Sequence, residues 1–206
     1  MLKEVFLGRN PSHFQVNSIV KSFIVSETFV WSAWNFVIPI FAIFAANHIT
    51  GGNVEIAAST FSVYLLVRVI FELISGKYLT TSSQSSKYII AIAGIIFVSL
   101  SYLGFAVSTT VLPLYFFYSI TGIGMGIATP AKNSLFSTHL DKNKEPEEWG
   151  IYDATVFIGM ALAATLGGFI AHQFGFKLLF FLASALNILG IIPYLLYIKP
   201  TNQPRI

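Results

Sequence analysis

Two ionisable residues, Glu27 and Arg68, interrupt long apolar stretches of the chain. If these stretches cross a bilayer, each such residue costs about 2.5–3.5 kcal/mol on insertion scales, and it usually faces a bundle interior and finds a partner. Both lie roughly 10 Å from the same side at ~1.5 Å per residue, so they are predicted to meet at one depth. Glu72 is a competing partner, because it follows Arg68 by four residues on the same helical face. The cluster either locks two helices together or binds a substrate or a proton.

An aromatic and polar stripe follows Glu27 along one helical face. Trp31, Trp34 and Asn35 come four, seven and eight residues after it. Pockets for small organic ligands are mostly apolar and aromatic with a few placed polar groups. We therefore expect the stripe to contact substrate together with three residues of the fourth apolar stretch, namely Tyr118, Thr121 and Met125. Ordinary helix packing is the alternative.

Lys132 and Asp153 flank the connection between the fourth and fifth apolar stretches. They are predicted to pair across this hairpin as a structural pair or gate latch rather than as substrate contacts. Small residues that let helices approach closely recur in the same two stretches. They are Gly122, Gly124, Gly126, Thr155, Gly159, Ala163, Gly167 and Gly168. The three glycines at 122–126 follow no strand, so a nucleotide-binding loop is not indicated.

Six apolar runs must position these residues, at 22–47, 54–75, 88–109, 111–135, 150–171 and 174–198. Each reaches the ~20 residues that a spanning helix needs. The chain is 55% hydrophobic and 10% charged, which predicts one all-α transmembrane domain of six helices over residues 1–206. Runs 88–109 and 174–198 are nearly uniform in apolar residues, as in lipid-facing helices, and the other four are expected to line an interior.

Basic residues gather on one side of the predicted membrane domain. Ten of the twelve lie at the termini or in or beside alternate connections, whereas only Lys177 lies on the opposite side and Arg68 lies deep within a run. By the positive-inside rule, both termini should be cytoplasmic, in the plasma (inner) membrane. This distribution explains the net charge of +3 without a nucleic-acid partner, and it disfavours insertion in two orientations.

The residue types exclude several kinds of chemistry. Cysteine is absent, and the four histidines lie outside the apolar runs or at their ends. No metal site or other cofactor is therefore expected. An intramembrane enzyme needs a nucleophile within reach of a base, and neither a Gly-x-Ser-Gly nor a His-Glu-x-x-His motif occurs. An enzyme is the least supported function.

Two sequence motifs lie in the expected order within the six runs. The stretch YSITGIGMGIATPAKNSL at 118–135 is glycine-rich, and GMALAATLGG at 159–168 closes on a double glycine. They are similar to the fourth-helix and fifth-helix signatures of the major facilitator superfamily, and the whole chain resembles the amino-terminal half of such a transporter. Tyr118, Ala163 with Ala164, and Thr80 depart from residues typical of proton-coupled members. The resemblance implies secondary active transport of a small solute by alternating access.

Transporters of that family usually have twelve helices in two similar halves related by an axis along the membrane normal. Six helices leave one face of the polar runs without a partner, and the surrounding lipid cannot satisfy Glu27, Asn35 or Arg68. We therefore expect two chains to work as a parallel homodimer, with the substrate path on the dimer axis. A separately encoded carboxy-terminal half is the main rival partner. A non-transporting subunit or relic of a twelve-helix transporter is the alternative function.

Overall fold

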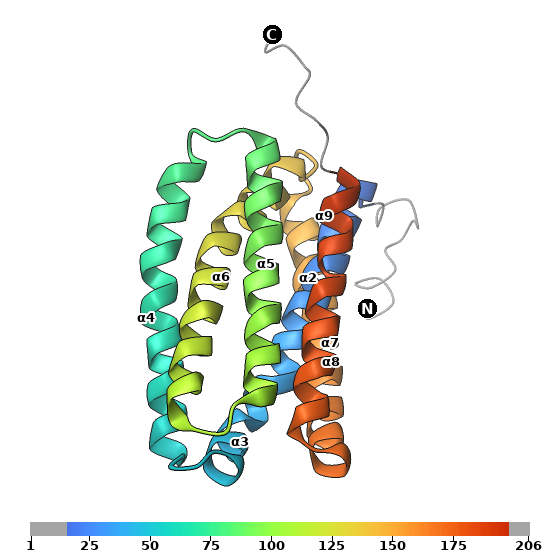
Figure 1. Cartoon of the computed structure of the whole chain (residues 1–206). Helices are drawn as coiled ribbons and strands as arrows, with labels where there is room; N and C mark the ends of the chain where they lie inside the picture. The colour runs from blue at the N-terminus through green and yellow to red at the C-terminus, as the bar shows by residue number, and fades with distance from the viewer. Residues whose placement is uncertain (1–15, 198–206) are drawn as a thin grey trace.

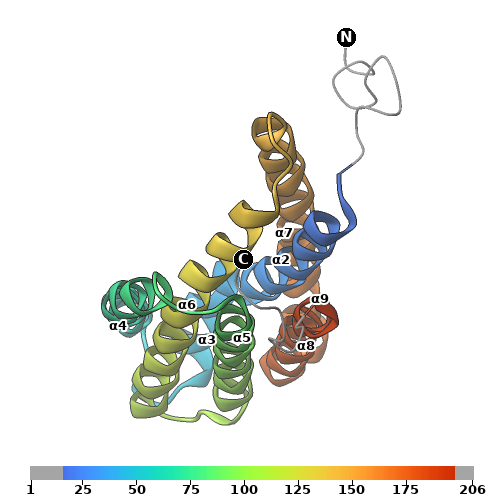
Figure 2. The same ribbon diagram turned by 90° about the horizontal axis from the view of Figure 1, so that it is seen from above.

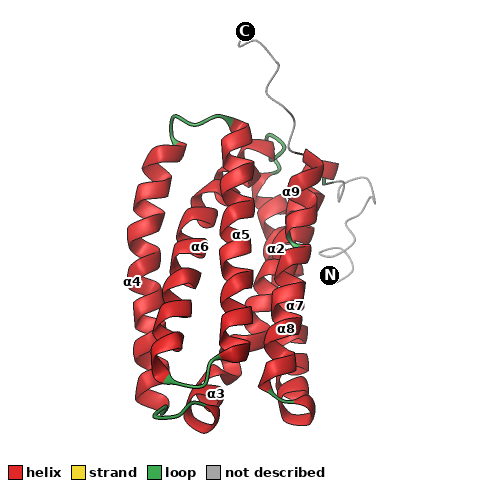
Figure 3. Cartoon of the chain, viewed as in Figure 1, coloured by secondary structure: helices red, strands yellow, loops and turns green. Residues whose placement is uncertain are grey.

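The computed structural model describes residues 16–197, and these form long helices joined by short connections (Figure 3). The elements are α2 (Ser18–Val37), η2 (Ile38–Ile40), α3 (Phe41–His48), α4 (Val54–Leu79), α5 (Gln84–Val107), α6 (Val111–His139), α7 (Glu145–Phe174), α8 (Phe176–Leu189) and α9 (Ile191–Tyr197). They make six segments that are long and apolar enough to cross a membrane, so the chain is an all-α multi-pass membrane protein. Among the residues used above, four of the ten basic residues on one side, namely Lys3, Arg9, Lys199 and Arg205, and one of the four histidines, His13, lie outside the described residues.

Proline and glycine account for the local breaks. Pro39 has no backbone N–H, and the first span changes at that point from α-helix to a 3-10 turn before continuing as α3. Gly175 adopts φ 85°, where a residue with a side chain would be strained, and it separates α7 from α8. Asn17 and Asn53 cap α2 and α4 by accepting from the backbone N–H groups of Val20 and Ile56 at 2.9 and 2.8 Å.

The helices extend beyond the predicted apolar runs on one side of the bundle. On that side the runs end at 22, 75, 88, 135 and 150, but the helices reach Ser18, Leu79, Gln84, His139 and Glu145. The terminal helical turns on this side contain more polar residues, so the mean hydropathy falls there, whereas the backbone hydrogen bonds of each helix continue for about one more turn. We call this side, which carries the α4–α5 and α6–α7 connections, the basic side, because Lys77, Lys87, Lys142 and Lys144 lie on it.

The first three spans and the last three are packed in the same way. Of the first three spans, α4 and α5 pack on α6, the first span of the other set. Of the last three, α7 and α8 pack on α2, the first span of the opposite set, and α5 meets α8. Exchanging the spans of one set for those of the other leaves this pattern unchanged. The chain is therefore a pair of three-helix repeats, with α4 and α7 in equivalent positions (Figures 1 and 2).

Viewed along the helices, α4 and α7 are the two edges of a face whose floor is made by α6 and α2 (Figure 2). We call this surface the open face. In the most apolar windows of α4 and α7 only 17% of residues are buried, against 44–50% in the other four spans. Runs 88–109 and 174–198, likened above to lipid-facing helices, expose apolar side chains such as Leu100 and Leu182, and α5 and α8 also form much of the core. The interior predicted from polar residues in the other four runs corresponds to the open face, not to the middle of this bundle.

Aromatic rings fill the core on the side opposite the basic side. Phe41 of α3 contacts Tyr118 of α6 and Phe105 of α5, with ring centroids 4.7 and 5.2 Å apart. Phe180 of α8 packs 5.7 Å from Phe105. These contacts join both three-helix repeats and position the inner surfaces of α2 and α6.

Candidate functional site

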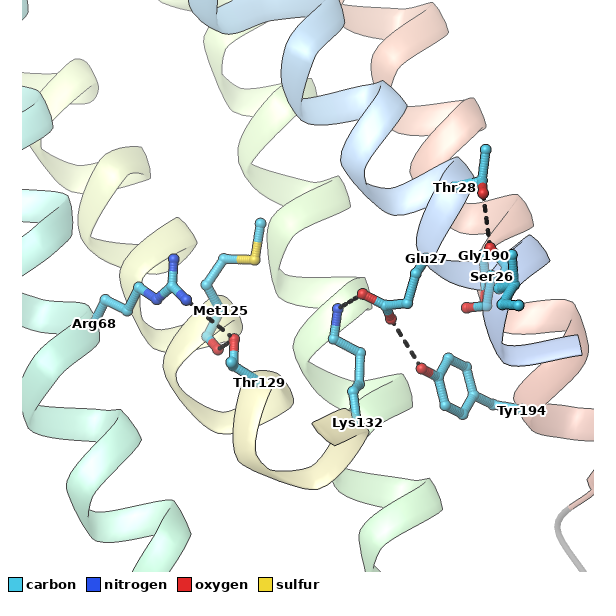
Figure 4. Close-up of polar contacts among 10 residues, drawn as sticks. Ser26, Glu27, Thr28, Arg68, Met125, Thr129, Lys132, Gly190 and Tyr194 are labelled. Carbon is cyan, nitrogen blue, oxygen red and sulfur yellow. Dashed lines mark hydrogen bonds and ion pairs between the residues drawn. The ribbon is translucent and has the colours of Figure 1, made fainter. Parts of the chain in front are cut away.

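A buried ion pair joins α2 to α6. Lys132 Nζ lies 2.8 Å from Glu27 Oε2, and the two side chains are only 5% and 7% exposed. The Tyr194 hydroxyl of α9 donates to Glu27 Oε1 at 3.0 Å, so the three side chains converge from three helices (Figure 4). Burying two charges is unfavourable unless their geometry is good and the remaining valences are satisfied. The Tyr194 bond provides such a partner for the second carboxylate oxygen.

The surroundings of the ion pair are tightly packed. A cavity of about 10 Å³ adjoins it, which is room for about one water molecule. The lining consists of Phe23, Glu27, Lys132, Asn133, Phe136, Trp149, Tyr152 and Tyr194. In this conformation the cluster links helices and has no space for an organic solute.

Two pairings predicted from sequence are wrong. Glu27 pairs with Lys132 and not with Arg68, and Lys132 therefore does not pair with Asp153, which is exposed on α7. Equal depth was a sound inference for Glu27 and Arg68, but α4 packs on α6 rather than on α2. Pairing depends on rotation about each helix axis as well as on depth.

Arg68 instead belongs to a second, half-exposed cluster on the open face. Its Nε donates to Glu72 Oε2 at 3.1 Å, and one terminal nitrogen donates to the Tyr64 hydroxyl at 2.9 Å. The other terminal nitrogen donates to Thr129 Oγ1 of α6 at 3.4 Å (Figure 4). The Arg68 and Glu72 side chains are 22% and 37% exposed. Glu72, the competing partner considered from the sequence, is thus the carboxylate that Arg68 meets.

The aromatic stripe of α2 reaches this cluster through Trp34. Its ring lies 5.0 Å from that of Tyr64 and 6.5 Å from that of Phe61, which places it against α4. Trp31 and Asn35 are also half-buried, and Asn35 Nδ2 donates to the Trp31 carbonyl at 3.0 Å. The stripe and the Arg68 cluster therefore form one apolar and polar surface.

The three α6 residues predicted to complete a pocket lie behind that surface. Tyr118, Thr121 and Met125 are 1–2% exposed. The Thr121 hydroxyl donates to the Phe117 carbonyl of its own helix at 2.9 Å. In this conformation they pack the core and do not reach the open face, whereas Thr129 of the same helix does.

Most of the small residues lie where helices approach closely. A Cβ on Gly126 would lie 2.8 Å from the Arg68 carbonyl oxygen, and one on Gly122 would lie 2.7 Å from that of Tyr64. The remaining close approaches are Gly124 against Gly94, Gly159 against Thr28 and Ser32, Gly167 against the Phe36 backbone, and buried Ala163. The prediction of close helix packing does not hold within this chain for two residues: a Cβ on Gly168 would meet open space, and Thr155 is exposed.

A polar contact at the basic side was not predicted. Asn17, besides capping α2, donates through Nδ2 to the His139 carbonyl at 2.9 Å and to Asp141 Oδ1 at 3.1 Å. The Asp141 backbone N–H donates to Glu148 Oε2 at 2.9 Å. The contact joins the start of α2 to the α6–α7 connection. The asparagine before an apolar helix was a capping signal, but nothing in the sequence paired it with residues more than a hundred positions away.

Other surfaces show less chemistry. A groove of about 450 Å³ lies between α2, α7 and α8, but its lining is apolar apart from Ser32. Over residues 16–197, no group of three His, Cys, Asp or Glu side chains is arranged to hold a metal ion. The ion pair and the open face are therefore the candidates for a polar functional site in the described chain.

Fold and site together define a multi-pass membrane protein with a polar, unpartnered helical face. The sequence profile of the Major Facilitator Superfamily matches residues 23–206, and the chain belongs to that family. It is 28% identical over 157 residues to an uncharacterized MFS-type transporter of Methanocaldococcus jannaschii, an alignment that covers 76% of this chain and 39% of that protein.

Two further relatives show the same partial coverage. Identity to multidrug resistance protein 2 of Bacillus subtilis is 24% over 164 residues, 79% of this chain and 39% of that protein. Identity to the proton-coupled antiporter flippase LtaA of Staphylococcus epidermidis is 24% over 117 residues, 53% and 30% of the two chains. The POT family transporter PepTSo has the same fold, with a TM-score of 0.78 at 16% identity, covering 93% of this chain and 40% of that one. The chain thus spans about 30–40% of the length of these relatives.

Proposed function

We propose that this chain is one six-helix unit of a secondary transporter that moves a small solute across the plasma membrane by alternating access, with both ends of the unit on the cytoplasmic side. The observation that carries the proposal is the Arg68–Glu72 pair, half-exposed on the open face within a membrane-spanning helix. Hydrocarbon cannot solvate such groups, whereas a watery path between two units can.

The open face has the shape and composition of a contact with a second unit. Exposed Leu65 and Val69 follow Phe61 on α4 at helical spacing, and Ala161 is exposed on α7. A polar floor flanked by apolar edges suits a path in the middle with contacts along both sides. The buried Glu27–Lys132 pair would hold α2 and α6 together on the basic side, as a site of gating or proton coupling.

A parallel second copy is the partner proposed. A twofold axis along the membrane normal, in front of the open face, would place α4 of one copy against α7 of the other (Figure 2). Leu65 is eleven residues from the start of α4 at Val54, and Ala161 is thirteen from the end of α7 at Phe174. These positions differ in depth by only ~3 Å. The one-sided lysines permit this arrangement and disfavour an inverted pair.

Crosslinking of two differently tagged copies in native membranes tests the assembly. Leu65→Cys in one copy should crosslink to Ala161→Cys in the other, whereas Leu196→Cys, exposed on α9, should not crosslink to either. Gly159 and Ala163 are unsuitable positions because they face α2. A crosslink to a different six-helix protein would replace the homodimer by a heteromer, and absence of any crosslink would contradict a second unit.

Alternating access is tested separately by labelling a cysteine at Asn35, near the middle of the first span. In sealed vesicles of each orientation it should react with an impermeant maleimide from both sides, because the path opens to each in turn. Val98→Cys, buried in the core, should react from neither. Labelling of Asn35→Cys from one side only would favour a static subunit.

A further inference from the structure

Arg68 has hydrogen-bonding capacity that the described part of the chain does not use. A guanidinium has five N–H groups, and three of them donate to Glu72, Tyr64 and Thr129. One N–H remains on each terminal nitrogen. Both lie in the plane of the guanidinium and are able to donate to the oxygens of a carboxylate.

Glu72 offers the complementary capacity. Its Oε2 accepts from Arg68, but its Oε1 has no hydrogen-bond partner among residues 16–197, and the side chain is 37% exposed. A free carboxylate oxygen is an acceptor for an ammonium group. The free donors and the free acceptor belong to groups that already touch, so one small molecule can reach both.

Charge balance favours a ligand that uses both. Arg68 and Glu72 together are neutral, and they lie within membrane-spanning segments where an uncompensated charge is costly. A simple anion or a simple cation would leave the occupied site with a net charge. A zwitterion would engage both free valences and keep the site neutral.

The adjoining surface is apolar and aromatic. Tyr64, which accepts the hydrogen bond from Arg68, lies 5.0 Å from the ring of Trp34. Leu65 and Val69 are 44% and 56% exposed on the same helix. A ligand held at the charged pair would therefore extend an apolar group across Trp34 and Leu65.

We propose that Arg68 and Glu72 bind a zwitterionic solute of the α-amino acid class with an apolar side chain, its carboxylate on Arg68 and its ammonium on Glu72. This rests on the proposed function, because the open face becomes a solute path when a second unit covers it. The proposal adds a substrate class and assigns one charged end of the solute to each residue.

Three probes that share a phenyl group and a two-carbon spacer separate the charge requirements: L-phenylalanine, 3-phenylpropanoate and 2-phenylethylamine. Binding is measured by calorimetry on the protein purified with its native partner in lipid nanodiscs. L-phenylalanine should bind about tenfold or more tightly than either singly charged probe, because each of those leaves either Arg68 or Glu72 without its charged partner on the ligand. Arg68→Gln should abolish the preference over 2-phenylethylamine, and Glu72→Gln the preference over 3-phenylpropanoate.

Matched controls lie on the same helix. Lys77→Gln removes an exposed positive charge, as Arg68→Gln does, and Glu55→Gln removes an exposed negative charge, as Glu72→Gln does; the two residues lie at opposite ends of α4. Both control variants should leave both preferences unchanged. The proposal would be overturned if either singly charged probe bound as tightly as L-phenylalanine, or if the preferences survived both site variants. It would also be overturned if no probe showed saturable binding. The Leu65–Ala161 crosslink and Asn35→Cys labelling report on the proposed function independently, so its failure is distinguishable from that of the zwitterion site.

Discussion

Breaking the Glu27–Lys132 pair should destabilise the protein far more than breaking the pair on the open face. Both members are at least 93% buried, joined at 2.8 Å. Glu27→Gln would leave the Lys132 ammonium without a carboxylate, and Lys132→Met would leave the Glu27 carboxylate without a cation. Removing one partner of a buried pair costs about 3–5 kcal/mol. For a domain of this size that corresponds to a fall in Tm of about 6–20 °C.

The double variant identifies the cause. Glu27→Gln with Lys132→Met leaves two neutral side chains, so it should be less destabilised than the sum of the single variants, with a coupling of about 2–3 kcal/mol. Thermal unfolding in detergent, followed by tryptophan fluorescence, measures all four proteins. The chain supplies its own control cycle, because the i,i+4 Arg68–Glu72 pair is 22–37% exposed and should couple by only about 0.2–1 kcal/mol. Single variants within about 1 kcal/mol of the parent, or strictly additive effects, would refute the reasoning.

Three further outcomes are expected. Cysteines at Asn53, Thr110 and Gln173 should label from outside intact cells, and cysteines at Ser83 and Asn143 should not; the reverse pattern would contradict the orientation proposed. Gly167→Ala should destabilise by about 1–3 kcal/mol because the new methyl group meets the Phe36 backbone, whereas Gly168→Ala, in open space, should be neutral or slightly stabilising; equal Tm values would count against this packing. Asn187→Leu should lower Tm because it removes hydrogen bonds of 2.9 and 2.8 Å to the Ile95 carbonyl and Ser99 Oγ; an unchanged Tm would show that the bonds contribute little.

The six spans could be predicted from sequence because hydropathy over about twenty residues is a strong signal. The family could also be predicted, since helix order and small-residue spacing survive where individual motifs are loose. The ends of the spans could not, because turns that contain polar residues at both ends, such as Ser18–Lys21, continue a helix without contributing to its apolar run. A capping residue such as Asn17 was the available signal for that extension.

Partners within the bundle were harder to predict. The sequence identified Glu27, Arg68 and Lys132 as the informative charges but could not give the rotation of each helix about its axis. The role of Tyr194 could not be predicted, because a tyrosine in a uniformly apolar run resembles any other aromatic residue until the partner of its hydroxyl is known. Gly167 and Gly168 are likewise indistinguishable by type, yet 100° of helical rotation turns one toward Phe36 and leaves the other in open space.

The two ends of the α2–α6 contact are held by interactions of different character. Near the basic side the contact is an ion pair, whose energy depends on specific atoms staying within hydrogen-bond distance. Towards the opposite side the span that contains α2 and α3 meets α6 through the rings of Phe41 and Tyr118, 4.7 Å apart, and dispersion contacts tolerate sliding. A relative tilt of these two spans would therefore turn about the Glu27–Lys132 contact, while the rings of Phe41 and Tyr118 at the other end slide past one another.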